Sequence, residues 1–498
     1  MNRRKIILKN GFVGLTGQII SEFLQFIVRI LVLRYIGVEV LGISATFTSL
    51  LQTLSLTELG FQMAVVYYLY QPLNQHDEIK INQILTILKR VYEVIGIIFI
   101  CISIACMPIL QYILKDIDIT IAVIAYYIIM SMNIACTYFM AYKRALLLAD
   151  QKDYISQTAD CLFNVVISIF KIGVIILFRN YIIFLLLQTI QTVGANIVIH
   201  LFCKRKYSFL CISKFEMSIF KSISKDVKNV FMGKLAGYVY GATDNLIISS
   251  FVGAVYVGYL SNYIVFITAI KKALGSMFYA MTSIIGNMLT EKSEIKNREI
   301  TFRKYSYVRY VLASMIITPW VLFADDAVRI LYGAQYILSD FIVVLLAIDL
   351  YIHIVYTPCC EYINGSGYFK IDKYIAMFGA GTNIITSTCF VLKMGVAGVL
   401  VGTVLSQVFF WVGRSSIVYL KIFGLSKKVY FKYISTNVRW IIVLIFQIIL
   451  FSNIRSKIIM ENYTLELIIE FILCEVITIF VQLIVFHVSE EQRELLKK

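Results

Sequence analysis

Long apolar runs alternate with short polar stretches along almost the whole chain. A run of about twenty apolar residues is enough to cross a bilayer as one helix. Runs of that order recur along the chain, and the sequence therefore predicts an all-α, polytopic membrane protein with about 14 transmembrane helices. We expect the first helix directly after Lys9 and the others at 42–70, 91–114, 119–142, 155–178, 181–203, 230–252, 256–289, 307–324, 338–360, 374–392, 396–420, 434–451 and 465–487.

The positive charges test this assignment independently. The first run contains Glu22 and Arg29 and no cleavage site follows it, so we expect a retained helix rather than a signal peptide. With the N-terminus in the cytoplasm, outward loops hold only seven of the 46 Lys and Arg residues, as the positive-inside rule requires. We therefore expect both termini in the cytoplasm. The seven are Arg34, Lys115, Arg179, Arg329, Lys393, Arg455 and Lys457.

Composition supports the same class. Hydrophobic residues make up 59% of the chain and charged residues 15%, with a mean hydropathy of +0.81, which excludes an ordinary soluble domain. The net charge of +16 sits in short loops between apolar runs, so we expect no nucleic-acid partner. The ten cysteines, including the Cys359-Cys360 pair, lack zinc-like spacing. We predict no metal site, no cofactor and no disulfide framework.

Two pairs of matching segments indicate an internal repeat. Gly37 and Gly42 match Gly253 and Gly258 at an offset of 216 residues. Residues 164–168 and 383–387 also match, at an offset of 219. Six helices precede the repeat, an even number, so both halves enter the membrane in the same direction. We expect two six-helix lobes related by this repeat, plus two C-terminal helices. The predicted parts are 1–203, the N-terminal lobe; 204–228, a basic cytoplasmic linker; 229–421, the C-terminal lobe; and 422–498, two extra helices and a cytoplasmic tail.

Glycines and prolines mark three of these helices. Gly233, Gly237 and Gly241 recur every four residues and predict close packing of a neighbouring helix. Pro108 and Pro319 lie in corresponding helices of the two lobes, and we expect them to interrupt those helices, with a tolerated kink as the alternative for each.

Ionisable residues inside apolar runs are costly in hydrocarbon and therefore indicate a polar interior. Glu22 and Arg29 are seven residues apart and share one face of the first helix, while Asp349 and His353 are four apart on another. Together they predict a central polar cavity, although mutually neutralising pairs that only hold helices together are the alternative for each residue. The candidates are Glu22, Arg29, Glu58, Asp160, Lys171, Asp244, Lys271, Lys272, Asp349 and His353.

No enzyme motif accompanies these charges. The chain has no phosphate-binding glycine loop and no His-Glu-x-x-His helix, and it holds only four histidines. We therefore expect a transporter rather than an enzyme, with a membrane-embedded polysaccharide polymerase or acyltransferase as a distant alternative.

Four stretches resemble the Wzx-type polysaccharide repeat-unit flippases of the multidrug/oligosaccharidyl-lipid/polysaccharide exporter (MOP) superfamily. The resemblance implies transfer of an undecaprenyl-pyrophosphate-linked oligosaccharide across the bacterial cytoplasmic (inner) membrane, for O-antigen, capsule or exopolysaccharide synthesis. It also implies alternating access of the two lobes, coupled to an ion gradient, and leaves the polysaccharide polymerase and chain-length machinery open as partners. The stretches are Leu41-Gly42-Ile43, Leu54-Ser55-Leu56-Thr57-Glu58-Leu59-Gly60-Phe61, Tyr67-Tyr68-Leu69-Tyr70-Gln71-Pro72-Leu73 and Thr243-Asp244-Asn245.

For such a substrate we expect the positively and the negatively charged candidates to have different roles. Its polyprenyl tail can stay in the lipid bilayer, whereas its pyrophosphate needs a cationic path. Two other members of the superfamily remain alternatives: a peptidoglycan lipid II flippase, also with fourteen helices and a cationic cavity, and a multidrug/cation antiporter, typically with twelve helices and a carboxylate cavity. We expect Arg29, Lys171, Lys271, Lys272 and His353 to bind substrate, and Glu22, Glu58, Asp160, Asp244 and Asp349 to bind the coupling ion or to partner these cations.

Overall fold

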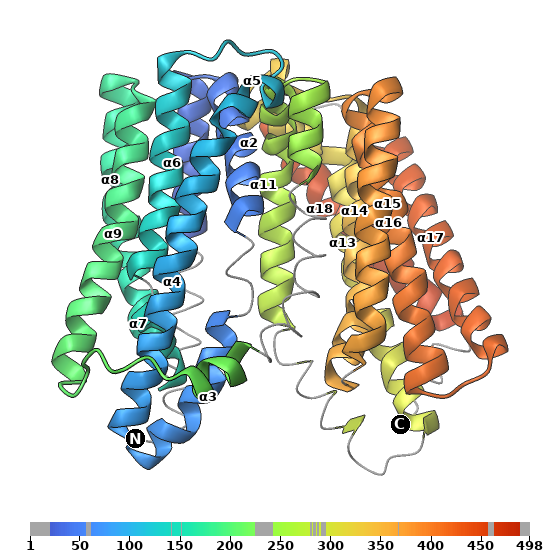
Figure 1. Ribbon diagram of the computed structural model, residues 1–498. Coiled ribbons are helices and arrows are strands. Elements are labelled where there is room, and N and C mark those ends of the chain that lie inside the picture. The colour runs from blue at the N-terminus through green and yellow to red at the C-terminus, as the bar shows by residue number, and fades with distance from the viewer. Residues whose placement is uncertain are drawn as a thin grey trace. The chain divides into compact units, whose positions relative to one another are not determined.

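The computed structural model describes residues 20–55, 61–140, 142–150, 152–224, 243–278, 281, 285, 288–289, 295–366, 368–456 and 463–488. All regular structure in these residues is helical (Figure 1). Eleven of the helices described there are long and apolar enough to cross a membrane, which confirms the all-α polytopic class. Three further predicted spans fall on segments described only in part: residues 20–35, residues 38–75 and residues 243–251.

The chain forms two compact units, Met1–Ser261 and Asn262–Lys498. In unit 1, α6, α8 and α9 pack side by side, and α3, α4 and α7 meet at the end where α9 terminates (Figure 1). The N-terminal unit contains α2 (Val38–Leu54), α3 (Phe61–Gln75), α4 (Glu78–Cys106), α5 (Leu110–Ile113), α6 (Ile121–Met140), α7 (Tyr142–Ala149), α8 (Tyr154–Phe178) and α9 (Tyr181–Lys206).

Helix α11 (Ala254–Met277) leads from unit 1 into unit 2. In unit 2, α14 and α15 both pack on α16, while α17 and α18 pack on α13. Phe302 on α13 is fully buried among aromatic rings, with Tyr362 at 5.0 Å between centroids. The remaining helices are α13 (Ile295–Leu331), α14 (Asp340–Ser366), α15 (Phe369–Met394), α16 (Val396–Ser416), its π-helical extension (Ile417–Ile422), α17 (Lys427–Arg455) and α18 (Tyr463–Val488).

The two glycine segments matched at an offset of 216 each begin with a glycine at positive φ. Gly37 (φ 120°) directly precedes α2, and Gly253 (φ 147°) directly precedes α11. Both angles lie where a side chain would be strained. The turn at Gly253 is further held by Asp116, whose carboxylate accepts hydrogen bonds from the backbone N–H groups of Ala254 (2.6 Å) and Val255 (3.2 Å). The repeat is therefore visible in backbone geometry as well as in sequence.

The prolines do not act alike. Pro108 lies in the 3₁₀ turn Met107–Ile109 that separates α4 from α5, as expected. Pro319 lies within α13, which continues from Ile295 to Leu331 without a break, so the expected interruption there is wrong. A proline removes only one N–H from the hydrogen-bond ladder, and a long helix packed on its neighbours can continue past it. Gly233, Gly237 and Gly241 lie outside the described residues.

Candidate functional site

Two of the predicted cationic residues line one cavity of unit 1. Arg29, from helical residues 20–35, and Lys171, from the middle of α8, both border a cavity of about 380 Å³. Arg29 donates a hydrogen bond to the hydroxyl of Ser261 on α11. The cavity wall thus brings together charges that are 142 positions apart in the chain (171 − 29).

Lys171 is held in place by α9. Its side chain lies in a buried position, with the residue only 8% exposed. Its Nζ donates to the amide oxygen of Gln191 at 3.0 Å and lies 5.1 Å from the ring centroid of Phe184. Both contacts leave the positive charge intact, since a neutral amide and an aromatic face orient an ammonium without neutralising it.

The described lining of this cavity includes two positively charged side chains. Amides and hydroxyls surround the two cations, and no carboxylate is among the described residues that line it. A cavity with two cations and hydrogen-bonding neutral groups favours an anionic ligand. The neutral polar lining consists of Gln25, Ser44, Asn164, Ser168, Tyr181, Gln188, Gln191 and Thr192.

Asp160, on the same helix as Lys171, lies in a different environment. Its two carboxylate oxygens each accept a 2.7 Å hydrogen bond from the guanidinium of Arg144 on α7. The Nε of Arg144 donates to Asn196 on α9 at 2.8 Å. This bidentate pair ties α7, α8 and α9 together, which is the arrangement of a helix-fastening charge pair.

Unit 2 has its own charged cluster. Lys271 on α11 donates to Asp349 on α14 at 3.0 Å, and the amide of Gln407 on α16 donates to the other carboxylate oxygen at 3.0 Å. His353 lies one turn after Asp349, with its ring edge-to-face on Tyr356. The charge of Lys271 is thus balanced in this conformation.

The other candidates are less well placed. Glu22 and Asp244 are partly buried and lie outside the lining of the Arg29–Lys171 cavity. Lys272 is exposed on α11, on a different face from Lys271. Glu58 lies outside the described residues.

Sequence reasoning missed several polar groups. Gln188 and Gln191 are uncharged, and a search for ionisable residues passes over them, although their spacing of three puts them on one face of an apolar helix. A buried network in unit 2 was also missed: Arg309, only 2% exposed, donates to Glu361 (2.9 Å) and to the hydroxyl of Tyr305 (2.7 Å). A search for uncharged amides in the apolar runs would have found the two glutamines.

Comparison with known sequences places the chain in a family. The model of the family described as "Polysaccharide biosynthesis protein" matches residues 7–283. No curated protein matches the sequence significantly.

Solved structures share the fold at low sequence identity. A lipid II flippase MurJ in an inward closed conformation aligns with a TM-score of 0.68 and 14% identity, over 95% of this chain and 97% of that one. An inward-facing multidrug resistance MATE family transporter of the MOP superfamily aligns with a TM-score of 0.64 and 14% identity, over 82% and 98%. A MOP superfamily transporter from Pyrococcus furiosus, described as having a binding pocket of reversed polarity, gives 0.53 and 15%, over 84% and 97%. The fold is therefore that of MurJ and the MATE transporters.

Proposed function

The chain belongs to the polysaccharide biosynthesis protein family, and we propose that it is a flippase for an undecaprenyl-pyrophosphate-linked oligosaccharide repeat unit. The repeat unit would cross the bacterial cytoplasmic membrane and then serve polysaccharide synthesis. Two features support this proposal: the family itself, and a fold shared with a lipid II flippase. The multi-pass architecture supplies the membrane setting that such a reaction needs.

The observation that carries the proposal is the Arg29–Lys171 cavity. A pyrophosphate bears several negative charges, which the guanidinium and the ammonium offset, and the described residues of the lining include no carboxylate. The amides and hydroxyls of the wall suit sugar hydroxyl groups, which both donate and accept hydrogen bonds. A cation substrate would instead meet two like charges there.

Ion coupling fits the cluster in unit 2. In our proposal, a proton arriving at the carboxylate of Asp349 cancels its charge and weakens its hold on the ammonium of Lys271. The ammonium of Lys271 would then be released from the pair, which changes the contact between α11 and α14. Loss of the proton would restore the Lys271–Asp349 pair and complete the cycle of alternating access.

Deleting the gene in its host tests the function. We expect loss of surface polysaccharide, with the complete lipid-linked repeat unit accumulating in the inner leaflet, and restoration of both by the wild-type gene. An absent precursor would indicate a biosynthetic enzyme instead. Single repeat units displayed on the outer surface would indicate a polymerase. Either outcome would reject the flippase assignment.

A lipid II flippase is the second candidate, because the MurJ structure aligns over 95% of the chain with a TM-score of 0.68. The two substrates share an undecaprenyl pyrophosphate and differ in the sugars. Expression of this chain in cells depleted of their own lipid II flippase separates the candidates. Rescue of growth would favour lipid II, whereas continued lysis together with restored polysaccharide export in the deletion host would favour the repeat unit.

A further inference from the structure

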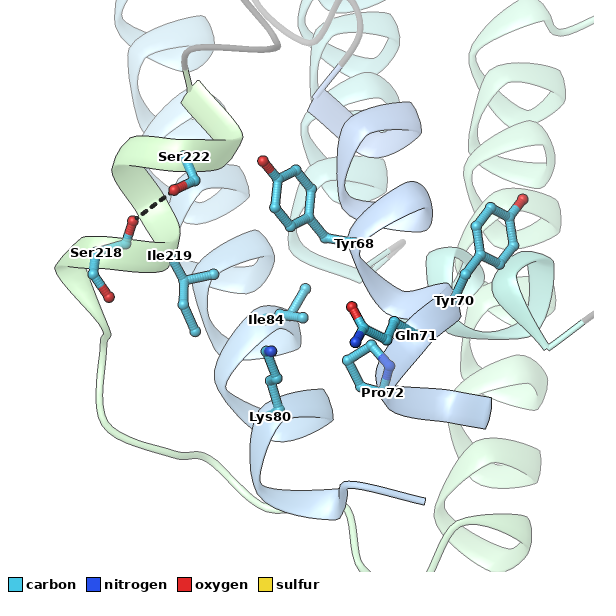
Figure 2. Close-up of a pocket in the computed structure, with 9 residues that line it drawn as sticks. All are labelled: Tyr68, Tyr70, Gln71, Pro72, Lys80, Ile84, Ser218, Ile219 and Ser222. Atoms are coloured by element: carbon cyan, nitrogen blue, oxygen red, sulfur yellow. Dashed lines mark hydrogen bonds between the residues drawn. The ribbon is translucent and has the colours of Figure 1, made fainter. Parts of the chain in front are cut away.

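A second cavity of unit 1, of about 470 Å³, shares no lining residue with the Arg29–Lys171 cavity. It lies between α3, the start of α4 and the helical residues 217–224 (Figure 2). The α3 wall comes from the Tyr68–Pro72 part of the Tyr-Leu-Tyr-Gln-Pro stretch, which the proposed transport path does not use.

Polar contacts hold residues 209–213, which lead into the helical residues 217–224, against α4. Asn82, 5% exposed, donates to the carbonyl of Phe209 (2.9 Å) and accepts from the N–H of Cys211 (3.1 Å). The N–H of Ser213 donates to the hydroxyl of Thr86 at 3.0 Å. Ile223, fully buried, anchors the short helix in the core of unit 1. The pocket wall is therefore preformed, which lowers the cost of ordering it around a ligand.

The chemistry of the pocket favours a phosphate group. The ammonium of Lys80 and the amide of Gln71 point into the space between α3 and residues 217–224, with the hydroxyl-bearing side chains of Ser218 and Ser222 on the opposite wall (Figure 2). No carboxylate is among the described residues that line the pocket. Of the carboxylates beside it, Asp77 accepts from the backbone N–H of Lys80, and Glu216 accepts from the hydroxyl of Ser218. The hydroxyls of Ser218 and Ser222 already donate, to the carboxylate of Glu216 (3.0 Å) and to the backbone carbonyl of Ser218 (3.2 Å). The donors that the pocket offers to a phosphate are therefore the ammonium of Lys80 and the amide of Gln71.

The surroundings of the pocket suit a lipid. The apolar side chains of Ile79, Phe215 and Met217 are 72%, 42% and 54% exposed beside the pocket-forming segments. The same end of unit 1 carries the basic residues 204–206 in the last turn of α9, and such residues mark the cytoplasmic surface of a membrane protein. Exposed apolar groups next to basic residues are characteristic of segments that lie in the headgroup region.

We propose that this pocket binds the phosphate-bearing headgroup of a membrane lipid from the inner leaflet. Lys80 contacts the phosphate, Gln71 contacts a neighbouring oxygen, and the acyl or prenyl chains leave along the exposed apolar side chains. An anionic phospholipid and a polyprenyl phosphate present the same chemistry. The site does not depend on the transport function, because any lipid of this kind would occupy it in a membrane.

Native mass spectrometry of the purified full chain tests the site. The protein is titrated separately with phosphatidylglycerol, a polyprenyl phosphate and inorganic phosphate. We expect Lys80→Gln to weaken lipid binding about tenfold, the size expected for a lost charged hydrogen bond, and Lys80→Arg to restore it. Lys221→Gln is the matched control, because Lys221 is exposed on the helical residues 217–224, which form the opposite wall, and does not line the pocket.

Each lipid arm has a distinct meaning. Lys80-dependent binding of phosphatidylglycerol identifies a phospholipid site, and Lys80-dependent binding of the polyprenyl phosphate alone identifies a carrier site. Equal lipid binding by wild type and Lys80→Gln would overturn the proposal. An equal loss of lipid binding in Lys221→Gln would also overturn it, because the binding would then depend on general surface charge. Inorganic phosphate that binds as tightly as either lipid would overturn it as well.

Discussion

Gly42 on α2 packs directly against the backbone carbonyl of Ala254 at the start of α11, and a side chain at position 42 would collide with that oxygen. Gly258, the repeat counterpart of Gly42, lies against α2 in the same way, with the carbonyl oxygen of Val38 2.6 Å from where its Cβ would be. Each repeat-related segment therefore uses its glycine to approach the backbone of the other. Small residues allow such close helix contacts in membranes.

This contact predicts that neither glycine tolerates a methyl group. Gly42→Ala and Gly258→Ala should each destabilise the protein by about 1–3 kcal/mol, because the backbone must move to relieve the overlap. Gly275→Ala is the control on the same helix as Gly258, since nothing lies within 4 Å of its added Cβ. Fluorescence-detected size exclusion after heating measures the midpoint of unfolding. A midpoint for Gly42→Ala equal to that of Gly275→Ala would contradict the close contact.

The sequence located charged groups better than it located their partners. Arg29 and Lys171 stand out because an ionisable residue in an apolar run is costly, and the structure places both on one cavity. Asp160 stands out for the same reason but pairs with Arg144, which precedes it by 16 residues and lies on another helix. Which of several cations meets a carboxylate depends on how helices pack. No single-sequence pattern contains that information.

The helix ends show a similar limit. Residues 295–306 are too polar to count as membrane-spanning, yet they form the first turns of α13, because a helix can continue beyond the bilayer. The hydropathy of the sequence indicates which residues lie in the hydrocarbon region of the bilayer. It does not report where helices end or which surfaces pack together.

The orientation of the chain in the membrane gives a second prediction. In a cysteine-free background, single cysteines at Asp118 and Asn453 should react with an impermeant maleimide added outside cells whose envelope admits it. Cysteines at Ser208 and Asn297 should react only after permeabilisation. All four positions are exposed, so accessibility of the side chain does not limit the reaction. The opposite pattern would invert the topology, and a mixed pattern would change the number of helices.

The Lys271–Asp349 pair gives a third prediction. Asp349→Asn should lower the unfolding midpoint and stop export, since it leaves the partly buried ammonium of Lys271 without its balancing charge. The double change Lys271→Gln with Asp349→Asn should recover the midpoint, because the remaining groups are neutral. If the pair carries the coupling ion, export stays lost in the double variant. Full export together with a recovered midpoint would show that the pair only holds α11 to α14.

The last prediction concerns the cationic cavity. Lys171→Gln and Arg29→Gln each remove one charge from the cavity lining, so under the proposed function each should reduce surface polysaccharide about 10- to 100-fold at normal protein abundance. Lys171→Arg and Arg29→Lys should retain part of the export, because a positive charge still meets the pyrophosphate. Arg34→Gln is the matched control, since Arg34 is exposed on the same helix as Arg29 and does not line the cavity.

The alternative for Arg29 is a structural pairing with Glu22, seven residues away on the same helix. That alternative predicts a different result for Glu22→Gln combined with Arg29→Gln, because removing both charges leaves neither unbalanced. If Arg29 contacts the substrate, the double variant folds normally and still fails to export, as judged by surface polysaccharide and by inner-leaflet accumulation of the lipid-linked repeat unit. Export at the wild-type level by the double variant would remove Arg29 from the substrate path and leave Lys171 as the cation of this cavity to be tested.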